Sequence, residues 1–217
     1  MRAACCEATV LRHEVIADDI RLLRVLWPDR DHAPHAGQFF TLRAWGADEA
    51  PFLSRPISVH KWEPETQTVE FLYQVIGEGT HKLAALKEGD SFQLTGPMGN
   101  GFDVESLTKT YKKFAVVGGG IGTAPMYQVA RELAAAGCKA IIYTDIACDG
   151  AMQGTNLALY RQLSAEVPGV EFTASGGISS EAELLELERM GVAAAILGKS
   201  LYTGALDLAR CVQLVQK

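Results

Sequence analysis

From residue 112 the sequence repeats one pattern four times: a short apolar strand, a turn and an amphipathic helix. The expected strands are KFAVVGGG, AIIYTDI, VEFTASGG and AAAILG, and a helical segment follows each of them. Four consecutive βα units require a parallel sheet with right-handed crossovers. Two folds meet this requirement, a small doubly wound sheet and one half of a (β/α)8 barrel.

Residues 6–96 show a different pattern of apolar and polar residues. The segments EATVLRHEVIADDIRLLRVLW and QTVEFLYQVIG carry β-branched and aromatic residues, partly in alternation with polar ones. Turn-forming stretches such as PDRDHAPHAGQ and KEGD separate them. This spacing predicts an antiparallel β barrel, with one short helix at THKLAALKEGD. The expected fold class is therefore a β barrel followed by an α/β part.

Charge and composition exclude several classes of protein. The net charge of −6 argues against a nucleic-acid binder, and no apolar run reaches the roughly 18 residues of a membrane span. The beginning, MRAACCEATVLRHEV, lacks the features of a secretory signal, so we expect a cytoplasmic protein. The cysteines lack metal-site spacing, so we expect free thiols and no metal. They are Cys5, Cys6, Cys138, Cys148 and Cys211.

The segment VVGGGIGTAP is the most informative motif. Gly119, Gly120 and Gly122 lie directly after an expected strand and before an expected helix, which is the context of a dinucleotide-binding loop. Thr123 stands where the strict G-x-G-x-x-G pattern has its last glycine, so a tight turn without a ligand is the alternative. Thr123 is also the candidate N-cap of the helix, with Pro125 in its first turn.

Two shorter motifs in the first half suit an anion. In LSRPISVH, a guanidinium offers phosphate a planar charged fork, proline fixes the backbone, and serine offers a hydroxyl. In VIGEGTHKL, two glycines permit a tight turn, and a threonine caps a helix whose free N–H groups face an anion. A surface turn and a simple capped helix are the alternatives. The candidate cofactor-binding residues are Arg55, Pro56, Ser58, Gly77, Gly79 and Thr80.

Taken in this order, these motifs resemble the ferredoxin-reductase superfamily, and within it the electron-transfer subunit of type B dihydroorotate dehydrogenase of pyrimidine biosynthesis. The resemblance covers residues 7–138. It implies a barrel that holds FAD, a βα domain that receives NAD(H), and a dihydroorotate dehydrogenase catalytic subunit as partner. Carried over, FAD would be held by Arg55, Ser58, Gly79 and Thr80, with Gly119, Gly120 and Gly122 near the nicotinamide.

After Lys139 the chain departs from that family, whose nicotinamide domain continues and ends in a cysteine cluster that carries [2Fe–2S]. Only Cys148 and Cys211 follow here, too few for four thiolate ligands. We therefore expect no iron–sulfur cluster, and the departure puts NAD(H) binding in doubt.

Residues 140–217 instead resemble the C-terminal part of the ProFAR isomerase of histidine biosynthesis, a (β/α)8 barrel, through IIYTDIACDGAMQGTN, ASGGISS and ILGKSLYTG. Barrel enzymes frequently bind phosphate in the loops after strands seven and eight. The resemblance implies a ribose-phosphate ligand, with Thr144 and Asp149 beside the reacting ribose. The family's acid and base come from the first and fifth strands, outside this stretch, so full isomerase activity is not expected. The candidate phosphate-binding residues are Gly176, Gly177, Gly198 and Lys199.

Together these patterns predict an FAD-binding barrel over residues 1–103, a truncated dinucleotide-binding βα unit over 104–139, and a phosphate-binding partial barrel over 140–217. The expected function is that of an FAD-dependent electron-transfer protein of the oxidoreductase class. The alternatives are a sugar-phosphate-binding module or isomerase, and a fusion without chemistry of its own. A half barrel leaves strand edges open, so we also expect a homo-oligomer.

Overall fold

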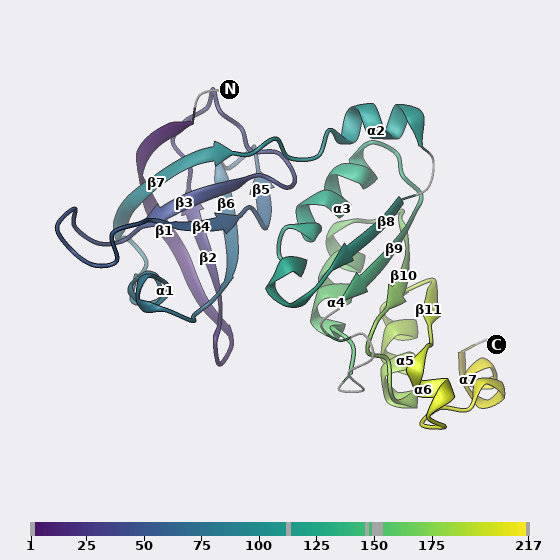
Figure 1. Cartoon of the computed structure of the whole chain (residues 1–217). Coiled ribbons are helices and arrows are strands. Elements are labelled where there is room, and N and C mark those ends of the chain that lie inside the picture. The colour runs from purple at the N-terminus through teal and green to yellow at the C-terminus, as the bar shows by residue number, and fades with distance from the viewer. Residues whose placement is uncertain (1–2, 112–113, 146–147, 149–153, 216–217) are drawn as a thin grey trace. The chain divides into compact units, whose positions relative to one another are not determined.

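The computed structural model describes residues 3–111, 114–145, 148 and 154–215, and the chain forms two compact units (Figure 1). The first unit contains Met1–Phe102 together with Ala124–Val129. The second contains Asp103–Thr123 and Ala130–Lys217.

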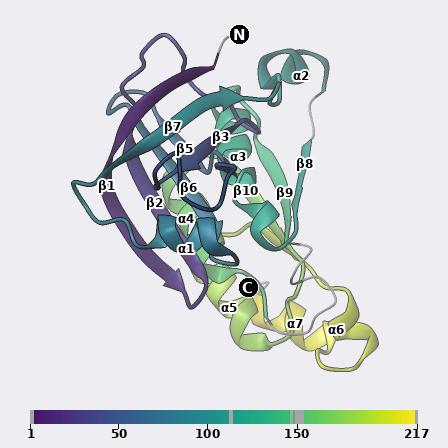
Figure 2. The ribbon, with the colours of Figure 1, turned by 60° about the vertical axis from the view of Figure 1, so that its left-hand side comes forward.

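The first unit is built on a seven-stranded antiparallel sheet, whose strands curve together in Figure 2. Its strand order is β4-β3-β7-β1-β2-β6-β5, and a single helix, α1 (Glu78–Ala84), lies between β6 and β7 in the sequence. The predicted antiparallel fold of this half is confirmed. The strands are β1 (Ala4–Ala17), β2 (Ile20–Leu26), β3 (Phe39–Arg43), β4 (Arg55–Ser58), β5 (Lys61–Glu63), β6 (Thr68–Gln74) and β7 (Ser91–Met98).

The core of the first unit is aromatic and β-branched. Phe40 is fully buried at its centre, and its ring meets the ring of Trp27 edge-on at 5.0 Å and that of Phe71 at 5.6 Å. Edge-to-face pairs of this kind contribute about 0.5–1.5 kcal/mol beyond the area they bury. Val25 and Val69, which pair between β2 and β6, lie in the same cluster. Alternation along the strands thus sends one set of side chains into this core.

The second unit contains a four-stranded parallel sheet with helices between its strands, as predicted. Its strands are β8 (Phe114–Gly118), β9 (Ala140–Asp145), β10 (Glu171–Ser175) and β11 (Ala194–Ile196). The helices after β7 are α2 (Val104–Thr110), a 3₁₀ turn at Gly120–Thr123, α3 (Met126–Ala135), α4 (Leu157–Glu166), α5 (Glu181–Arg189), α6 (Lys199–Tyr202) and α7 (Leu208–Val215). All belong to the second unit except the beginning of α3, residues 126–129, which is grouped with the first.

The strand order distinguishes between the two folds that the sequence left open. The four strands lie side by side in chain order, β8-β9-β10-β11. In a doubly wound sheet the order reverses after the first few strands, and ligands bind at that reversal. No reversal occurs among the described strands, so this sheet has the order of a segment of a βα barrel.

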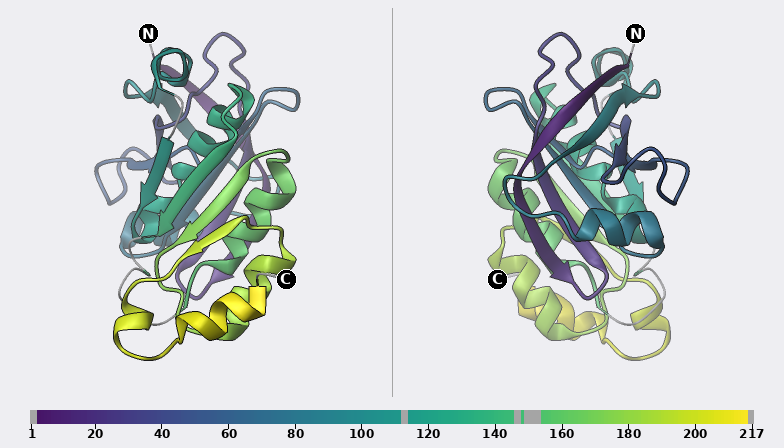
Figure 3. Two further views of the ribbon diagram at one scale, coloured as in Figure 1. Left: turned by 90° about the vertical axis from the view of Figure 1, so that its right-hand side faces the viewer. Right: turned by 90° about the vertical axis from the view of Figure 1, so that its left-hand side faces the viewer.

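One face of this sheet packs against helices. The side chains of Ile141, Tyr143 and Phe172 are buried on that face of the sheet. Leu133 of α3 and Leu163 of α4 are buried on the helices. Figure 3, left, looks onto the opposite face, with the strands in front and α3 and α4 behind them. None of the described helices is long and apolar enough to cross a membrane. The five cysteines are free thiols.

The close approach of Gly96 in β7 to the core yields a stability prediction. A Cβ at this position would lie 2.3 Å from the Phe40 ring, and Phe40 is fully buried. We expect Gly96→Ala to lower the free energy of unfolding by about 1–3 kcal/mol, because overpacking forces the ring or the strand to move. Urea denaturation measures this change.

The matched control is Gly122→Ala. No atom lies within 4 Å of the position that a Cβ would take there. Its free energy of unfolding should stay within about 0.5 kcal/mol of the parent value. Equal losses in the two variants would contradict the assignment of the effect to the Phe40 ring.

Candidate functional site

Arg55 and Gly79, from the two predicted anion motifs, meet in the first unit. A Cβ on Gly79 would lie 2.8 Å from Cδ of Arg55 and 3.1 Å from the ring of Trp45. Only glycine therefore lets the aliphatic stem of Arg55 lie against α1. The motif in β4 and the glycine motif at the beginning of α1 are therefore in direct contact.

The polar atoms of Arg55 are only partly satisfied. Nη2 donates a hydrogen bond to the carbonyl oxygen of Leu53 at 2.7 Å. Nε is buried and has no hydrogen-bond partner among the described residues. A buried guanidinium N–H without a partner costs free energy, and an anionic oxygen is the acceptor that suits it best. The position fits a phosphate or diphosphate group.

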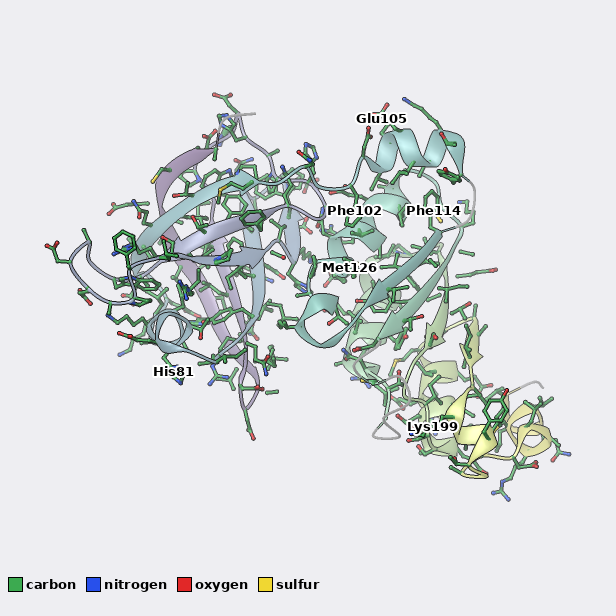
Figure 4. All side chains as sticks on the ribbon, in the orientation of Figure 1. His81, Phe102, Glu105, Phe114, Met126 and Lys199 are labelled. Carbon is green, nitrogen blue, oxygen red and sulfur yellow. The ribbon has the colours of Figure 1, made fainter. Side chains whose placement is uncertain are left out.

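Thr80 builds the turn that precedes α1. Its Oγ1 accepts hydrogen bonds from the N–H groups of Ile76 at 2.9 Å and Gly77 at 3.0 Å, and donates to the carbonyl oxygen of Gly77 at 2.8 Å. The hydroxyl thus fixes the backbone that holds Gly79 in place. His81, labelled in Figure 4, lies one residue further along α1 and also bonds the Gly77 carbonyl, at 2.9 Å.

The other two residues of the first motif lie in the β3–β4 ladder. Pro56 is exposed and pairs with Thr41, while Ser58 is half-buried and pairs with Phe39. Gly77 is the N-cap of α1, and a Cβ there would meet nothing within 4 Å. The structure therefore brings Arg55 to Gly79 and places Pro56 and Ser58 further along the strand.

Large apolar side chains are exposed on the same two segments. Phe52 is 84% exposed, Leu53 is 64% exposed and Ile76 is 75% exposed. Phe52 and Leu53 precede Arg55, and Ile76 precedes the glycine turn. These exposed apolar side chains therefore flank, in sequence, the two segments that meet at Arg55 and Gly79.

The glycine loop after β8 forms a tight turn. A Cβ on Gly118 would lie 2.8 Å from the backbone of Thr123, so only glycine allows this turn to close. The N–H of Gly122 donates to the carbonyl oxygen of Gly119 at 2.8 Å. The Thr123 hydroxyl donates to the carbonyl of Gly120 at 2.8 Å, inside the 3₁₀ turn. Thr123 thus closes the loop, whereas we expected it to cap α3, which begins at Met126.

The expected phosphate residues follow β10 and β11, at the carboxyl ends of these parallel strands. Gly176 and Gly177 have φ angles of +92° and +79°. A Cβ on Gly176 would lie 2.4 Å from the carbonyl oxygen of Asp145, and one on Gly177 would lie 2.4 Å from that of Gly154. These positions require glycine both for conformation and for space.

The second expected phosphate loop begins α6. Gly198 is the N-cap of α6, and the exposed Lys199 is its first residue (Figure 4). Ser200, the next residue, is 1% exposed, and its hydroxyl has no hydrogen-bond partner among the described residues. Sequence reasoning missed Ser200, since no pattern separates a buried serine from an exposed one in so short a helix.

Of the two expected catalytic residues, Asp149 lies outside the described residues. Thr144 is half-buried in β9, opposite Val117 and Ser175 in the two neighbouring strands. The next residue, Asp145, is 4% exposed at the end of the strand, and Asn156 Nδ2 lies 3.5 Å from its Oδ2. Burial, and then the charge of Asp145, raise the pKa of the Cys148 thiol, which favours its neutral form.

Glu183 organises the loops around these strand ends. Its carboxylate accepts hydrogen bonds from the backbone N–H groups of Thr155 (2.6 Å), Ser179 (3.0 Å) and Ser180 (3.0 Å). Desolvation raises the pKa of Glu183, but these hydrogen bonds outweigh it and hold the pKa below the ordinary range of a glutamate. The carboxylate is thus ionised at neutral pH. The capping-box pattern S-x-x-E at Ser180 was the signal that would have found it.

Comparison with protein families finds two similarities. Residues 100–207 match the model of the family described as histidine biosynthesis protein. The second similarity is to curated proteins described as the electron transfer subunit of dihydroorotate dehydrogenase B (NAD(+)). The Streptococcus pneumoniae relative is 34% identical over 171 residues, which cover 78% of this chain and 67% of the relative. The Listeria monocytogenes relative is 30% identical over 184 residues, 84% of this chain and 68% of the relative.

The two similarities overlap. Alignments of 171 and 184 residues are longer than the stretch 7–138 to which we expected this resemblance to be limited. The histidine-biosynthesis match begins at residue 100, well before the expected start at residue 140. The comparisons therefore draw no boundary at Lys139.

Solved structures resemble the chain in fold. A cytochrome P450 reductase from Amycolatopsis has a TM-score of 0.62 at 20% identity, covering 99% of this chain and 67% of that one. An NADH-dependent reduced ferredoxin-NADP oxidoreductase has a TM-score of 0.58 at 23% identity, covering 83% and 63%. These likenesses confirm a ferredoxin-reductase-like fold.

The chain spans only part of the length of each of these electron transfer subunits. The relative from Clostridium acetobutylicum is 48% identical over 97 residues, and the chain spans 37% of its length. For the Caldanaerobacter subterraneus relative the share is 48%. The longer alignments with the Streptococcus and Listeria proteins cover two thirds of those relatives at 30% identity or more. The chain therefore belongs to the family of the electron transfer subunit of dihydroorotate dehydrogenase B.

Proposed function

We propose that this protein is an FAD-binding electron-transfer protein whose flavin site is centred on Arg55 and Gly79. The observation that carries the proposal is the buried Nε of Arg55, which has no partner among the described residues although its stem is held against α1. A diphosphate oxygen beside Nε would complete the hydrogen bonding of the guanidinium.

The residues around Arg55 have distinct roles in this proposal. Gly79 admits the stem of Arg55, and Thr80 fixes the turn by its three hydrogen bonds. The exposed side chains of Phe52, Leu53 and Ile76 would cover apolar parts of the cofactor. When bound, a flavin supplies a carrier that accepts and passes on electrons; the chain supplies the binding and the orientation.

The family supports a partner as well. Relatives that are 30–34% identical are electron transfer subunits of dihydroorotate dehydrogenase B, a class that implies a separate catalytic subunit. We accordingly propose a dihydroorotate dehydrogenase catalytic subunit as the recipient or donor of the electrons.

The proposal does not include a nicotinamide site at the loop after β8. The Gly122 N–H and the Thr123 hydroxyl both donate within the loop, so these two donors are already used. The described strands also lack the reversal of order at which dinucleotides bind in open α/β sheets.

A second function is favoured by the loops at the strand ends. We propose that Gly176, Gly177, Gly198 and Lys199 bind the phosphate of a sugar phosphate. The left-handed glycines after β10, the lysine that begins α6 and the histidine-biosynthesis match over residues 100–207 support this. Isomerase activity is not part of the proposal, because the family draws its acid and base from strands outside this stretch. In this view the chain joins a flavin barrel to a partial sugar-phosphate barrel.

The flavin proposal predicts a yellow protein. We expect the purified full chain to bind added FAD, with flavin absorbance retained after gel filtration. Arg55→Ala should weaken FAD binding about 10- to 100-fold, because a hydrogen bond to a charged group contributes about 1.5–3 kcal/mol. Fluorescence titration of FAD measures the change.

Arg12→Ala is the matched control, since Arg12 is a surface arginine whose side chain pairs with Glu14 at 2.8 Å. It should bind FAD as the parent does. A full chain that folds but takes up no flavin would refute the proposal, as would equal affinities of the Arg55 and Arg12 variants.

The phosphate proposal predicts thermal stabilisation by ribose 5-phosphate. We expect Tm of the full chain to rise with ligand concentration, because the ligand binds only the folded state. Lys199→Ala should remove most of this rise, while Lys139→Ala should retain it. Lys139 is also exposed, but it precedes β9 and so lies at the opposite, amino-terminal edge of the sheet. Identical shifts in both variants would place the ligand elsewhere.

A further inference from the structure

The second face of the parallel sheet is apolar and uncovered. Two rows of directly paired residues run across the strands: Ala115, Ile142, Thr173 and Ala194 form one row, and Val117, Thr144, Ser175 and Ile196 form the next. Because partners in register point to the same side of a sheet, both rows belong to one face. We call the following six residues the open face: Ala115, Val117, Ile142, Thr173, Ala194 and Ile196.

The open face is exposed where it is most apolar. Val117 is 53% exposed, Ile142 is 40% exposed and Ile196 is 47% exposed. The side chains between them in sequence, such as Val116 and Ile141, are buried toward the helices. Parallel sheets occur almost only with both faces covered, so a β-branched face left in water is unusual.

The two edges of the sheet are also open. The order β8-β9-β10-β11 ends with β8 on one side and β11 on the other, and each has a partner strand on one side only among the described strands. Unpaired edges of this kind recruit further strands. Any partner that covers the open face alone would still leave these two edges unpaired.

One arrangement would cover the open face and also pair both edge strands. We infer that a second copy of this chain packs on the open face, and that the two four-stranded sheets close into one eight-stranded parallel barrel. Eight parallel strands are the number that closes in βα barrels, and their order around such a barrel is the chain order seen here. A twofold axis along the barrel sets β8 of each copy beside β11 of its partner.

The chemistry of the open face fits this occupant. Val117, Ile142 and Ile196 are the branched aliphatic side chains that fill barrel interiors, and Ala115 and Ala194 leave room for the larger residues of the partner. None of the six residues of the open face is charged, so burying them against an identical surface leaves no ion unpaired among them. The exposed Glu171, two residues before Thr173, lies on the same side of the sheet at the amino-terminal end of β10, where the rim of a barrel keeps it in water.

The arrangement also affects the strand-end loops. In a closed parallel barrel the carboxyl ends of all eight strands lie at one rim. The loops at Gly176 and Gly198 of both copies would therefore surround the same opening. The inference does not depend on the flavin or phosphate proposals, because it rests on strand order, exposure and free edges alone.

The test is the mass of the full chain in solution and its response to charge on the open face. We expect sedimentation equilibrium at micromolar concentration to give twice the mass of one chain. Ile142→Asp should raise the dimer dissociation constant at least about tenfold, because the dimer would bury an unpaired carboxylate. Val15→Asp is the matched control: Val15 is 69% exposed in β1 of the first unit and is not one of the open-face residues, and its variant should stay dimeric.

A second variant and two further measurements test the inference independently of Ile142. Ile196→Asp, on the edge strand β11, should act as Ile142→Asp does, and circular dichroism should show that both variants are folded. Hydrogen exchange should be slower at the amides of β8 and β11 in the parent than in the monomeric variants. A monomeric parent, a dimer that survives both folded variants, or edge amides unaffected by dissociation would each overturn the inference.

Discussion

The loops of both units depend on glycines that let another segment approach to where a Cβ would be. Gly79 admits the stem of Arg55, Gly118 admits the backbone of Thr123, and Gly176 admits the carbonyl of Asp145. Each contact lies at the ends of the elements concerned: the beginnings of α1 and β4, the ends of β8 and the 3₁₀ turn, and the ends of β10 and β9. A side chain at any of these positions would push the two apart by a few tenths of an ångström or more, and would displace the groups that face a ligand.

Much of the fold was predictable because it follows from local patterns. Alternation of apolar and polar residues indicated antiparallel strands in the first half, and the repeated strand–helix rhythm indicated a parallel sheet in the second. The sequence could not choose between a doubly wound sheet and a barrel segment. That choice depends on where β11 lies, and both folds bury the same strand pattern. Only the pairing of Thr173 with Ala194 decides it.

The sequence predicted which residues would form the candidate sites, but only some of the contacts that those residues make. The motifs pointed to Arg55 and to the glycine turn before α1, but no local signal shows that Nε of Arg55 is buried without a partner. Thr123 illustrates the opposite case. A threonine before a proline and a helix fits an N-cap pattern, yet its hydroxyl donates to Gly120 because the 3₁₀ turn offers a carbonyl at 2.8 Å. Competition between nearby acceptors is invisible in sequence.

The two proposed anion sites differ in how much of the binding cost folding has already met. At Arg55 the cost of burying the Nε–H has already been met in folding, so an oxygen placed there would recover a hydrogen bond. Lys199 is an exposed side chain, and ordering it on a ligand costs side-chain conformational entropy. The glycines after β10 offset part of that cost, because their backbone is already fixed by the carbonyls of Asp145 and Gly154. If both proposals hold, preorganisation favours tighter anion binding at Arg55 than at the strand ends of the parallel sheet.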